Sequence, residues 1–224
     1  MKQFFFTLFI LFCPLFLSSN SFVIVLDQGT YCQTTLHQEA LDCVQCLQKK
    51  LSNVFPQAHI VVSGTSQETS DTLQIASFSN RITAHLHISF NFFTESTFTK
   101  AMVNSSSQKG SSKEIIKNIR IYTCLTPVGM QKKSNKLALI PVEKAYEQHA
   151  QESKIYAQHF FTTTKNGSFP VFEPKELPLK TLQGVTAPSF LIEIGIGKSK
   201  EWKTYFPQLF EGLKEVIASA MENK

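Results

Sequence analysis

The sequence predicts an α/β protein with a doubly wound, mostly parallel β-sheet flanked by helices on both faces. Short apolar, β-branched runs alternate along the chain with longer segments in which apolar residues recur every three or four positions. The first pattern indicates strands covered on both faces, and the second indicates amphipathic helices. Their alternation implies right-handed crossovers between parallel strands. With 42% apolar and 17% charged residues among 224, the chain can bury a large core, which excludes general disorder.

The clearest expected strand is residues 22–26, Phe-Val-Ile-Val-Leu, because this segment carries no polar side chain. A turn, Asp27-Gln28-Gly29-Thr30, follows it directly. Further strands are expected at 59–62, 86–92, 119–124 and 189–194, with a short extended segment at 177–182. Residues 94–113 are rich in Ser, Thr and Lys, which predicts a surface excursion.

Helices are expected where apolar residues follow the helical period: at 37–51, from Asp71 or Thr72 to 82, within 141–161, and at 206–221. In the second of these helices, Leu73, Ala76 and Ser79 or Asn80 form the narrow inner face. The third begins at a proline, which suits a first helical turn because the missing N–H has no partner there anyway.

The first 21 residues have the order of a secretory signal peptide. Lys2 precedes an uncharged stretch dense in Phe and Leu at 4–17, and the small polar run Ser-Ser-Asn-Ser follows at 18–21. The apolar stretch is short for a membrane span, which needs about 20 residues, so an uncleaved anchor is the lesser alternative. We therefore expect a periplasmic or secreted protein that has one domain, residues 22–224, and no stable membrane span after cleavage.

The charge balance does not favour nucleic acid as a partner. The formal net charge of +5 becomes +4 when Lys2 is removed with the signal peptide, since 5 − 1 = 4 and residues 1–21 contain no acid. Lysine and arginine are scattered along the chain, and no nucleic-acid-reading motif accompanies them. An exported chain of this kind is not expected to bind nucleic acid.

Four cysteines remain after cleavage: Cys32, Cys43, Cys46 and Cys124. Cys43 and Cys46 are three residues apart, but a zinc knot would need a second pair, which the sequence lacks. In an exported protein we expect one or two structural disulfides, one of which joins Cys32 to the helix that carries Cys43 and Cys46. The spacing leaves the connectivity open.

Ligands of doubly wound sheets bind beyond the carboxyl ends of the strands, which directs attention to residues 27–30, 91–93 and 193–197. The sequence at these places resembles the zinc-dependent N-acetylmuramoyl-L-alanine amidases. The turn Asp27-Gln28-Gly29-Thr30 resembles the family's Asp-Pro-Gly-His-Gly. Residues 76–91 are similar to the family's helix and following strand, which carry Ala-Asn-Arg, Ala-Asp-Leu and Ile-Ser-Ile-His-Ala-Asn. Residues 187–195 are similar to the family's closing strand, Pro-Ala-Val-Leu-Val-Glu-x-Gly-Phe. These blocks occur in the family's order and span nearly the whole mature chain.

The resemblance implies a definite chemistry. These enzymes hold one zinc ion with two histidines and one glutamate, and a glutamate on the closing strand acts as general base. They cleave the amide between N-acetylmuramic acid and L-alanine in peptidoglycan. Because an amide resists hydrolysis, the metal must polarise the carbonyl and lower the pKa of its bound water, while the carboxylate shuttles protons.

Carried over position by position, the resemblance loses its metal ligands. The first histidine falls on Thr30, the glutamate at the helix start on Leu36, and the second histidine on Asn91; only the closing-strand acid survives, as Glu193. Zinc prefers imidazole, thiolate or carboxylate donors, so no zinc cofactor is expected. Glu193 keeps the general-base position without a metal beside it, and Thr30, Asn91 and Arg81 are the candidate substrate-binding residues.

Neighbouring residues offer a rearranged zinc site as an alternative. Glu39 lies about one helical turn from the Leu36 position, and His37 is adjacent to it, so both could join Glu193 around a metal. His85 and His87 share a strand face with Asn91, but His87 lies about 13 Å upstream, too far to replace it. We interpret these two histidines as partly covered polar residues at a helix–sheet boundary.

Two functions from different classes follow. In the first, the protein acts at the cell wall as a metal-free, non-catalytic homologue that binds peptidoglycan or muropeptide fragments. In the second, it is an active peptidoglycan amidase with the rearranged zinc site. A third possibility is a scaffold that binds another envelope protein and regulates its hydrolase activity.

Overall fold

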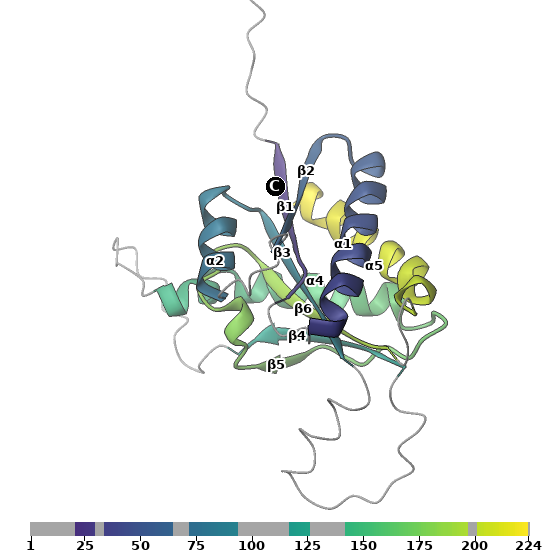
Figure 1. The fold of residues 1–224 in the computed structure, drawn as a ribbon. Coiled ribbons are helices and arrows are strands. Elements are labelled where there is room, and N and C mark those ends of the chain that lie inside the picture. The colour runs from purple at the N-terminus through teal and green to yellow at the C-terminus, as the bar shows by residue number, and fades with distance from the viewer. Residues whose placement is uncertain are drawn as a thin grey trace, which may run out of the picture.

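The computed structural model describes residues 21–29, 34–64, 72–93, 117–125, 142–196 and 201–223 (Figure 1). The expected signal peptide, the expected excursion at 94–113 and Thr30 lie outside this described part of the chain. The elements, in chain order, are β1 (Phe22–Asp27), α1 (Thr34–Val54), β2 (Ala58–Ser63), α2 (Thr72–Arg81), β3 (Leu86–Phe93), β4 (Ile119–Cys124), η1 (Val142–His149), α4 (Ala150–Thr164), β5 (Lys175–Leu177), η2 (Lys180–Leu182), β6 (Ser189–Gly195) and α5 (Trp202–Glu222). The α/β class that the sequence predicts is confirmed.

The strands form one six-stranded sheet in the order β2-β1-β3-β6-β4-β5. Strand β1 pairs in parallel with β2 and β3, and β6 pairs in parallel with β3. Strand β4 pairs antiparallel to β6, so the sheet is mostly parallel but mixed. Because β4 runs opposite to β3, it starts at the sheet edge where β3 ends, and the connection between them does not have to cross the sheet.

Three helices, α1, α4 and α5, cover one face of the sheet. Alternate strand residues point into the main hydrophobic core on this face, among them Ile24, Leu26, Ile88, Phe90 and Ile192, all 0% exposed. Figure 1 shows α1 and α5 together on this side of the strands. This face carries nearly all of the large buried apolar side chains, and burial of such side chains is the main source of folding free energy.

The opposite face is covered more thinly, by α2 and the segment that contains η2. It has two small apolar clusters, one of Ala76, Val185 and Ala187 and one of Cys124, Leu182 and Leu191. The inner face of α2 consists of Ile75, Ala76 and Ser79, whereas Leu73 is 55% exposed. The prediction that Leu73 faces inward is therefore wrong: at 100° per residue it lies roughly 110° around the helix from the centre of the buried face.

Two further segments differ from the expected elements. The stretch 177–182 is not extended throughout, because β5 ends at Leu177 and Lys180–Leu182 form a single 3-10 turn. The helix expected within 141–161 consists of two parts, the 3-10 segment η1 and the α-helix α4, which continues to Thr164.

The expected disulfides are wrong for the three described cysteines. Cys43, Cys46 and Cys124 are all free thiols. Cys43 lies on the core side of α1 and is 0% exposed. Burial raises the pKa of the Cys43 thiol well above its usual value, which keeps the group protonated and unreactive.

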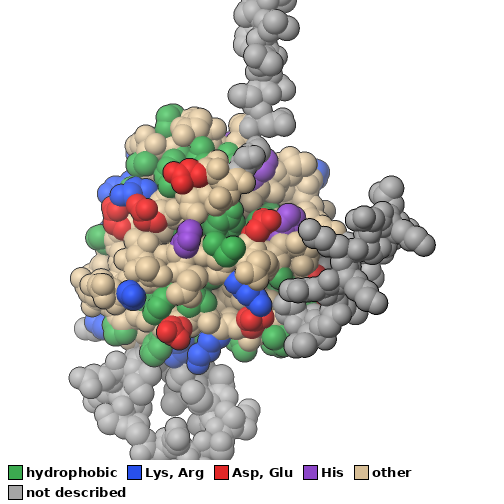
Figure 2. Space-filling view, turned by 180° about the vertical axis from the view of Figure 1, so that it is seen from behind, with side chains coloured by type: hydrophobic (Ala, Val, Ile, Leu, Met, Phe, Trp, Pro, Cys, Tyr) green, Lys and Arg blue, Asp and Glu red, His purple; other side chains and the backbone are tan. Residues whose placement is uncertain are grey.

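The surface mixes charges of both signs. Acidic and basic side chains are interspersed on the face seen in Figure 2, with small apolar areas between them. Within the described residues, no helix combines the length and the apolar character that crossing a membrane requires.

Candidate functional site

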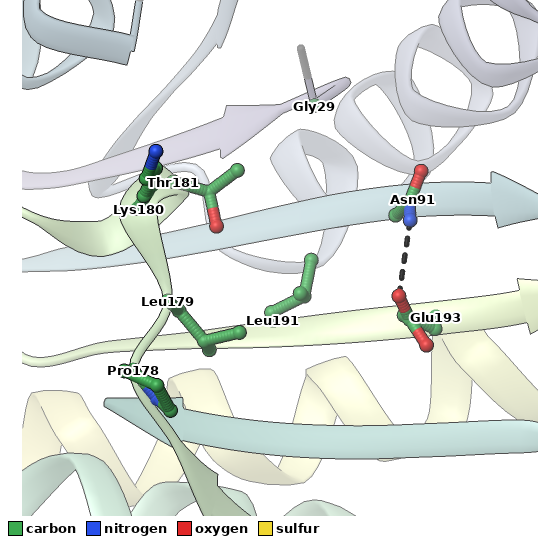
Figure 3. Close-up of a pocket in the computed structure, with 8 residues that line it drawn as sticks. All are labelled: Gly29, Asn91, Pro178, Leu179, Lys180, Thr181, Leu191 and Glu193. Atoms are coloured by element: carbon green, nitrogen blue, oxygen red, sulfur yellow. Dashed lines mark hydrogen bonds between the residues drawn. The ribbon is translucent and has the colours of Figure 1, made fainter. Parts of the chain in front are cut away.

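A cavity of about 430 Å³ opens on the thinly covered face of the sheet, toward the carboxyl ends of β3 and β6 (Figure 3). The turn after β1, the two central strands and the segment between β5 and η2 contribute its walls. The lining residues are Gly29, Asn91, Pro178, Leu179, Lys180, Thr181, Leu191 and Glu193. Two of the residues singled out in the sequence, Asn91 and Glu193, thus lie in one cavity.

Asn91 and Glu193 form a direct pair. They are register partners on neighbouring parallel strands. The Asn91 Nδ2 atom donates a hydrogen bond of 3.0 Å to Glu193 Oε1, drawn as the dashed line in Figure 3. An amide that donates to a carboxylate holds it in one orientation, because hydrogen bonds to charged acceptors are directional and comparatively strong. The remaining lone pairs of the Glu193 carboxylate can accept further donors.

Strand β4 brings aromatic and basic side chains to the other side of Glu193. Arg120 is the register partner of Glu193 across the β4–β6 pair. Its guanidinium carbon lies 5.1 Å from the centre of the Phe93 ring, and its Nε donates to Asn118 Oδ1 at 3.2 Å. The pKa of the Tyr122 phenol is raised, mainly by burial and then by the charge of Glu193, while Arg120 acts in the opposite direction. Tyr122 therefore remains a neutral donor beside the carboxylate.

Gly29 allows the turn after β1 to pack against β3. Its φ is +75°, and a Cβ at this position would lie 2.2 Å from the carbonyl oxygen of Phe90. No other residue fits there, since such contact with a backbone atom cannot be relieved by a side-chain rotation. The glycine of the Asp-Gln-Gly-Thr turn thus fixes the wall of the cavity next to Asn91.

The buried carboxylate of Asp27 joins strands β1, β2 and β3, and its role was not predicted from the sequence. Asp27 is 1% exposed, and its two carboxylate oxygens accept hydrogen bonds from Ser63 Oγ at 2.8 Å and from Ser89 Oγ at 2.7 Å. Both serines are register partners of Asp27. The sequence did contain an indication of this network: Asp27, Ser63 and Ser89 are small polar residues at the ends of, or within, otherwise apolar strands.

His87 is buried in the same layer, between the sheet and α2. It is 0% exposed, its Nδ1 lies 3.3 Å from Ser79 Oγ, and its buried Nε2 has no hydrogen-bond partner among the described residues. Burial lowers the pKa of the imidazole, and the nearby charge of Asp27 offsets part of that effect. The interpretation of His87 as partly covered is wrong, because Ser79 and the other small residues of α2 let the helix sit directly on the ring.

His85 lies just before β3 and is half-buried, as interpreted from the sequence. Its ring stacks on Phe22 with the ring centres 5.0 Å apart, and its Nδ1 accepts a hydrogen bond from the Val23 N–H at 3.0 Å. This histidine therefore ties the start of β1 to the chain that enters β3.

The other residues that the sequence indicated as functional candidates are spread over the fold. Arg81 is exposed at the end of α2, which leads into the amino end of β3, and it is not in the cavity. Leu36 is buried in the main core. On the same helix, the His37 Nε2 atom lies 3.4 Å from Gln28 Nε2, and Glu39 is 8% exposed. The structure thus brings Asn91 and Glu193 together but not Arg81, whose substrate-binding role stays a prediction.

The described donor set does not fit a zinc ion. Among the described residues, no group of three or more His, Cys, Asp or Glu is placed to hold a metal. The polar side chains that line the cavity are one carboxylate, one carboxamide, one hydroxyl and one ammonium group. Zinc in proteins takes three or four ligands from imidazole, thiolate and carboxylate groups, so one carboxylate does not make a zinc site.

Comparison with known proteins rests on structure. No protein-family model matches the chain, and no curated protein matches its sequence. Among solved structures, an N-acetylmuramoyl-L-alanine amidase from Clostridium difficile 630 is similar with a TM-score of 0.53 and 20% identity, over 92% of this chain and 100% of that one. The catalytic domain of the amidase CwlV from Bacillus (Paenibacillus) polymyxa var. colistinus has a TM-score of 0.53 and 11% identity, over 91% and 99%. An amidase from Mycobacterium smegmatis has a TM-score of 0.50 and 11% identity, over 91% and 98%.

At these identities the likeness extends to the path of the backbone, and it covers about nine tenths of the chain in each comparison. The α/β architecture and the order of the sequence blocks agree with it. The chain has the fold of the N-acetylmuramoyl-L-alanine amidases.

Proposed function

We propose that this protein is exported and acts at the cell wall as an amidase-like protein that binds peptidoglycan or its muropeptide fragments without cleaving them. In this proposal residues 1–21 are a signal peptide, and residues 22–224 form a single domain in the periplasm or outside the cell. The similar solved structures are amidases, which supports a cell-wall ligand for the shared fold.

The pairing of Asn91 with Glu193 carries the proposal. In the family's pattern these two positions hold a zinc-ligating histidine and the general base. Here a carboxamide donates to the carboxylate at 3.0 Å, so the site is organised around a hydrogen bond rather than around a cation. A carboxylate held in this way is a good acceptor for donors on a ligand, and the carboxamide beside it is not a ligand that zinc prefers.

The cavity also supports a binding role. Its volume of about 430 Å³ is in the range of small-ligand sites, and it combines apolar side chains with a few polar groups. Gly29 contributes backbone to one wall, and Thr181 presents a hydroxyl at another (Figure 3). Substrate contacts of an amidase fold can therefore persist where the catalytic centre does not.

The test compares binding with cleavage on the same sample. The protein is expressed from its full sequence, purified, and incubated with purified peptidoglycan and with soluble muropeptides, with and without added zinc. We expect co-sedimentation with peptidoglycan, no peptide release detected by mass spectrometry, and no change on addition of a chelator. Glu193→Gln should weaken the co-sedimentation, whereas Glu173→Gln, the same exchange on an exposed residue outside the cavity, should not.

Zinc-dependent release of peptides, lost with a chelator, would instead establish the active amidase with a site built from His37, Glu39 and Glu193. Failure to bind peptidoglycan, together with recovery of one stoichiometric envelope protein on the immobilised chain, would favour the regulatory scaffold. Either result overturns the proposal.

A further inference from the structure

Two side chains of opposite charge line the cavity without an ion-pair partner among the described residues, although Arg120 is the register partner of Glu193 on β4. Glu193 and Lys180 both line it, and neither forms an ion pair with any described residue. Figure 3 shows Asn91 and Glu193 together at one end of the cavity, and Lys180 with Thr181 at the other. Charged side chains without an ion-pair partner that face the same small cavity favour a ligand that carries the complementary charges.

The acidic end is built to accept hydrogen bonds. Glu193 Oε1 accepts from Asn91 Nδ2 at 3.0 Å, and the half-buried Tyr122 phenol lies against the same carboxylate. A carboxylate has about four acceptor positions, so at least two remain for a ligand. An ammonium group has three donors and a positive charge, and it matches this end better than a hydroxyl or an amide does.

The basic end is held by a fixed turn. Lys180 opens the 3-10 turn η2, in which the Gln183 N–H donates to the Lys180 carbonyl at 3.2 Å. The turn is tied to α2 through Asn80, whose Nδ2 donates to the Gly184 carbonyl at 2.7 Å and whose Oδ1 accepts from the Thr186 N–H at 2.9 Å. The backbone beneath Lys180 is therefore anchored, and the exposed ammonium can meet an anionic group at the rim.

The surface between the two ends is apolar. Leu179 and Leu191 lie between the charged ends in Figure 3, and Pro178 borders them. Leu191 is 4% exposed and packs with Leu182 and Cys124 beneath the cavity. An aliphatic chain of a ligand that contacts these leucines would bury apolar surface on the ligand and on the protein.

We infer that the cavity binds a zwitterionic peptide segment, with its ammonium group on Glu193, its carboxylate at Lys180 and an aliphatic stem over Leu179 and Leu191. The inference deepens the proposed function and rests on it. Of the two components of peptidoglycan, it selects the peptide stem, where a diamino acid supplies ammonium, carboxylate and aliphatic carbons within one residue. The N-acetylated sugars of the glycan carry no ammonium group, and they are not the ligand of this cavity.

The experiment uses four forms of one probe, a muramyl tripeptide that ends in lysine. The forms are the free peptide, the peptide acetylated on the side-chain ammonium of the lysine, the peptide amidated on the carboxylate of the lysine, and the peptide with both modifications. Isothermal titration calorimetry measures each against the full protein and its variants. Wild type should lose affinity about tenfold or more on acetylation, since a hydrogen-bonded charge is removed. Amidation should cost about two- to fivefold, because Lys180 is exposed and screened.

The variants assign each loss to one end of the cavity. In Glu193→Gln, acetylation of the probe should no longer matter, whereas amidation should still weaken binding. In Lys180→Gln the reverse should hold. Glu173→Gln and Lys165→Gln exchange the same groups on exposed residues outside the cavity, and they should behave as wild type. If a cavity variant does not fold, the acetylated and amidated probes still test the inference on the wild-type protein.

The outcomes separate this inference from the proposed function. If the four probe forms bind equally well, the zwitterion inference is wrong while peptidoglycan binding stands. If no muramyl peptide binds but the dipeptide alanyl-lysine does, with the same sensitivity to acetylation, the ligand class is right and the cell-wall function is wrong. If neither probe binds, both are overturned.

Discussion

The two faces of the sheet differ in what they bury. Toward α1, α4 and α5, the strands present large apolar side chains in a continuous core, including Phe90 and Phe190. Toward α2 and η2, the same strands present Asp27, Ser89 and His87, all buried, and the apolar clusters on this side are small. Successive residues of one strand therefore point to opposite faces, one into the large apolar core and the next into the layer of buried polar groups. The thick face stabilises the fold, and this leaves the thin face able to carry polar groups and a cavity.

The largest expected effect is on the thick face. Phe190→Ala removes a ring that is 0% exposed and lies 6.2 Å from the ring of Phe160, so it should lower the free energy of unfolding by about 3–5 kcal/mol. Urea denaturation followed by circular dichroism measures it. Phe172→Ala, at a residue 45% exposed, is the matched control and should change stability by less than about 0.5 kcal/mol. Equal losses in the two variants would contradict the assignment of the core to this face.

The next effect concerns the buried carboxylate of the thin face. Asp27→Ala leaves the hydroxyls of Ser63 and Ser89 without their acceptor, and it should cost about 1.5–3 kcal/mol in unfolding experiments. Replacing both serines by alanine in the same chain should recover part of that loss, since unpaired buried groups cost more than absent ones. A triple variant less stable than Asp27→Ala would show that the hydroxyls have other roles.

The third prediction is a pH dependence that belongs to the thin face. Burial lowers the pKa of His87 in the folded protein below 6.5, whereas the unfolded chain keeps the ordinary value. The unfolded state therefore binds a proton first, and stability falls as the pH drops below about 6.5, by at most about 1.4 kcal/mol per pH unit. The nearby Asp27 charge makes the slope shallower.

Thermal melting at pH 7.5 and 5.5 measures this slope. His87→Gln should melt with a weaker pH dependence between these values, whereas a variant of the exposed His59, His59→Gln, should keep the wild-type slope. An unchanged slope in His87→Gln would assign the titration to another group.

The smallest effect on stability is expected at Asn80. Asn80→Ala removes the hydrogen bonds to Gly184 and Thr186, which are partly solvent-accessible, and it should cost about 1 kcal/mol. Its local effect is larger: amide hydrogen exchange should accelerate at residues 180–186 while β3 and β6 stay protected. Asn53→Ala, on the exposed side of α1, is the control and should leave exchange in this segment unchanged.

The sequence predicted most elements because their apolar pattern is decided locally. Strand β4 has the expected bounds, 119–124, and β1 differs from its expected range by one residue. The antiparallel direction of β4 and the order of the strands could not be predicted, since the insertion of β6 between β3 and β4 depends on pairing between residues about 70 apart. Leu73 was misplaced because α2 turns the face that carries Ile75, Ala76 and Ser79 toward the sheet, and Leu73 lies outside this face.

The candidate site was only partly predictable. Motif order pointed to Asn91 and Glu193, and the structure brings them together. Lys180 and Thr181 had no signal, because they come from a short turn whose position depends on Asn80 and not on any local pattern. The buried state of Asp27 and His87 depends equally on which strands become neighbours, which a single sequence does not reveal.

The position of β6 in the sheet has a consequence for how the chain matures. Residues 189–195 form the seam between the β2-β1-β3 group and the β4-β5 pair, which share no ladder with each other. A chain that ends before this segment holds two unjoined groups of strands and an incomplete cavity, because Asn91 then lacks Glu193. The sheet and the cavity are therefore completed together, once the last quarter of the polypeptide has been synthesised.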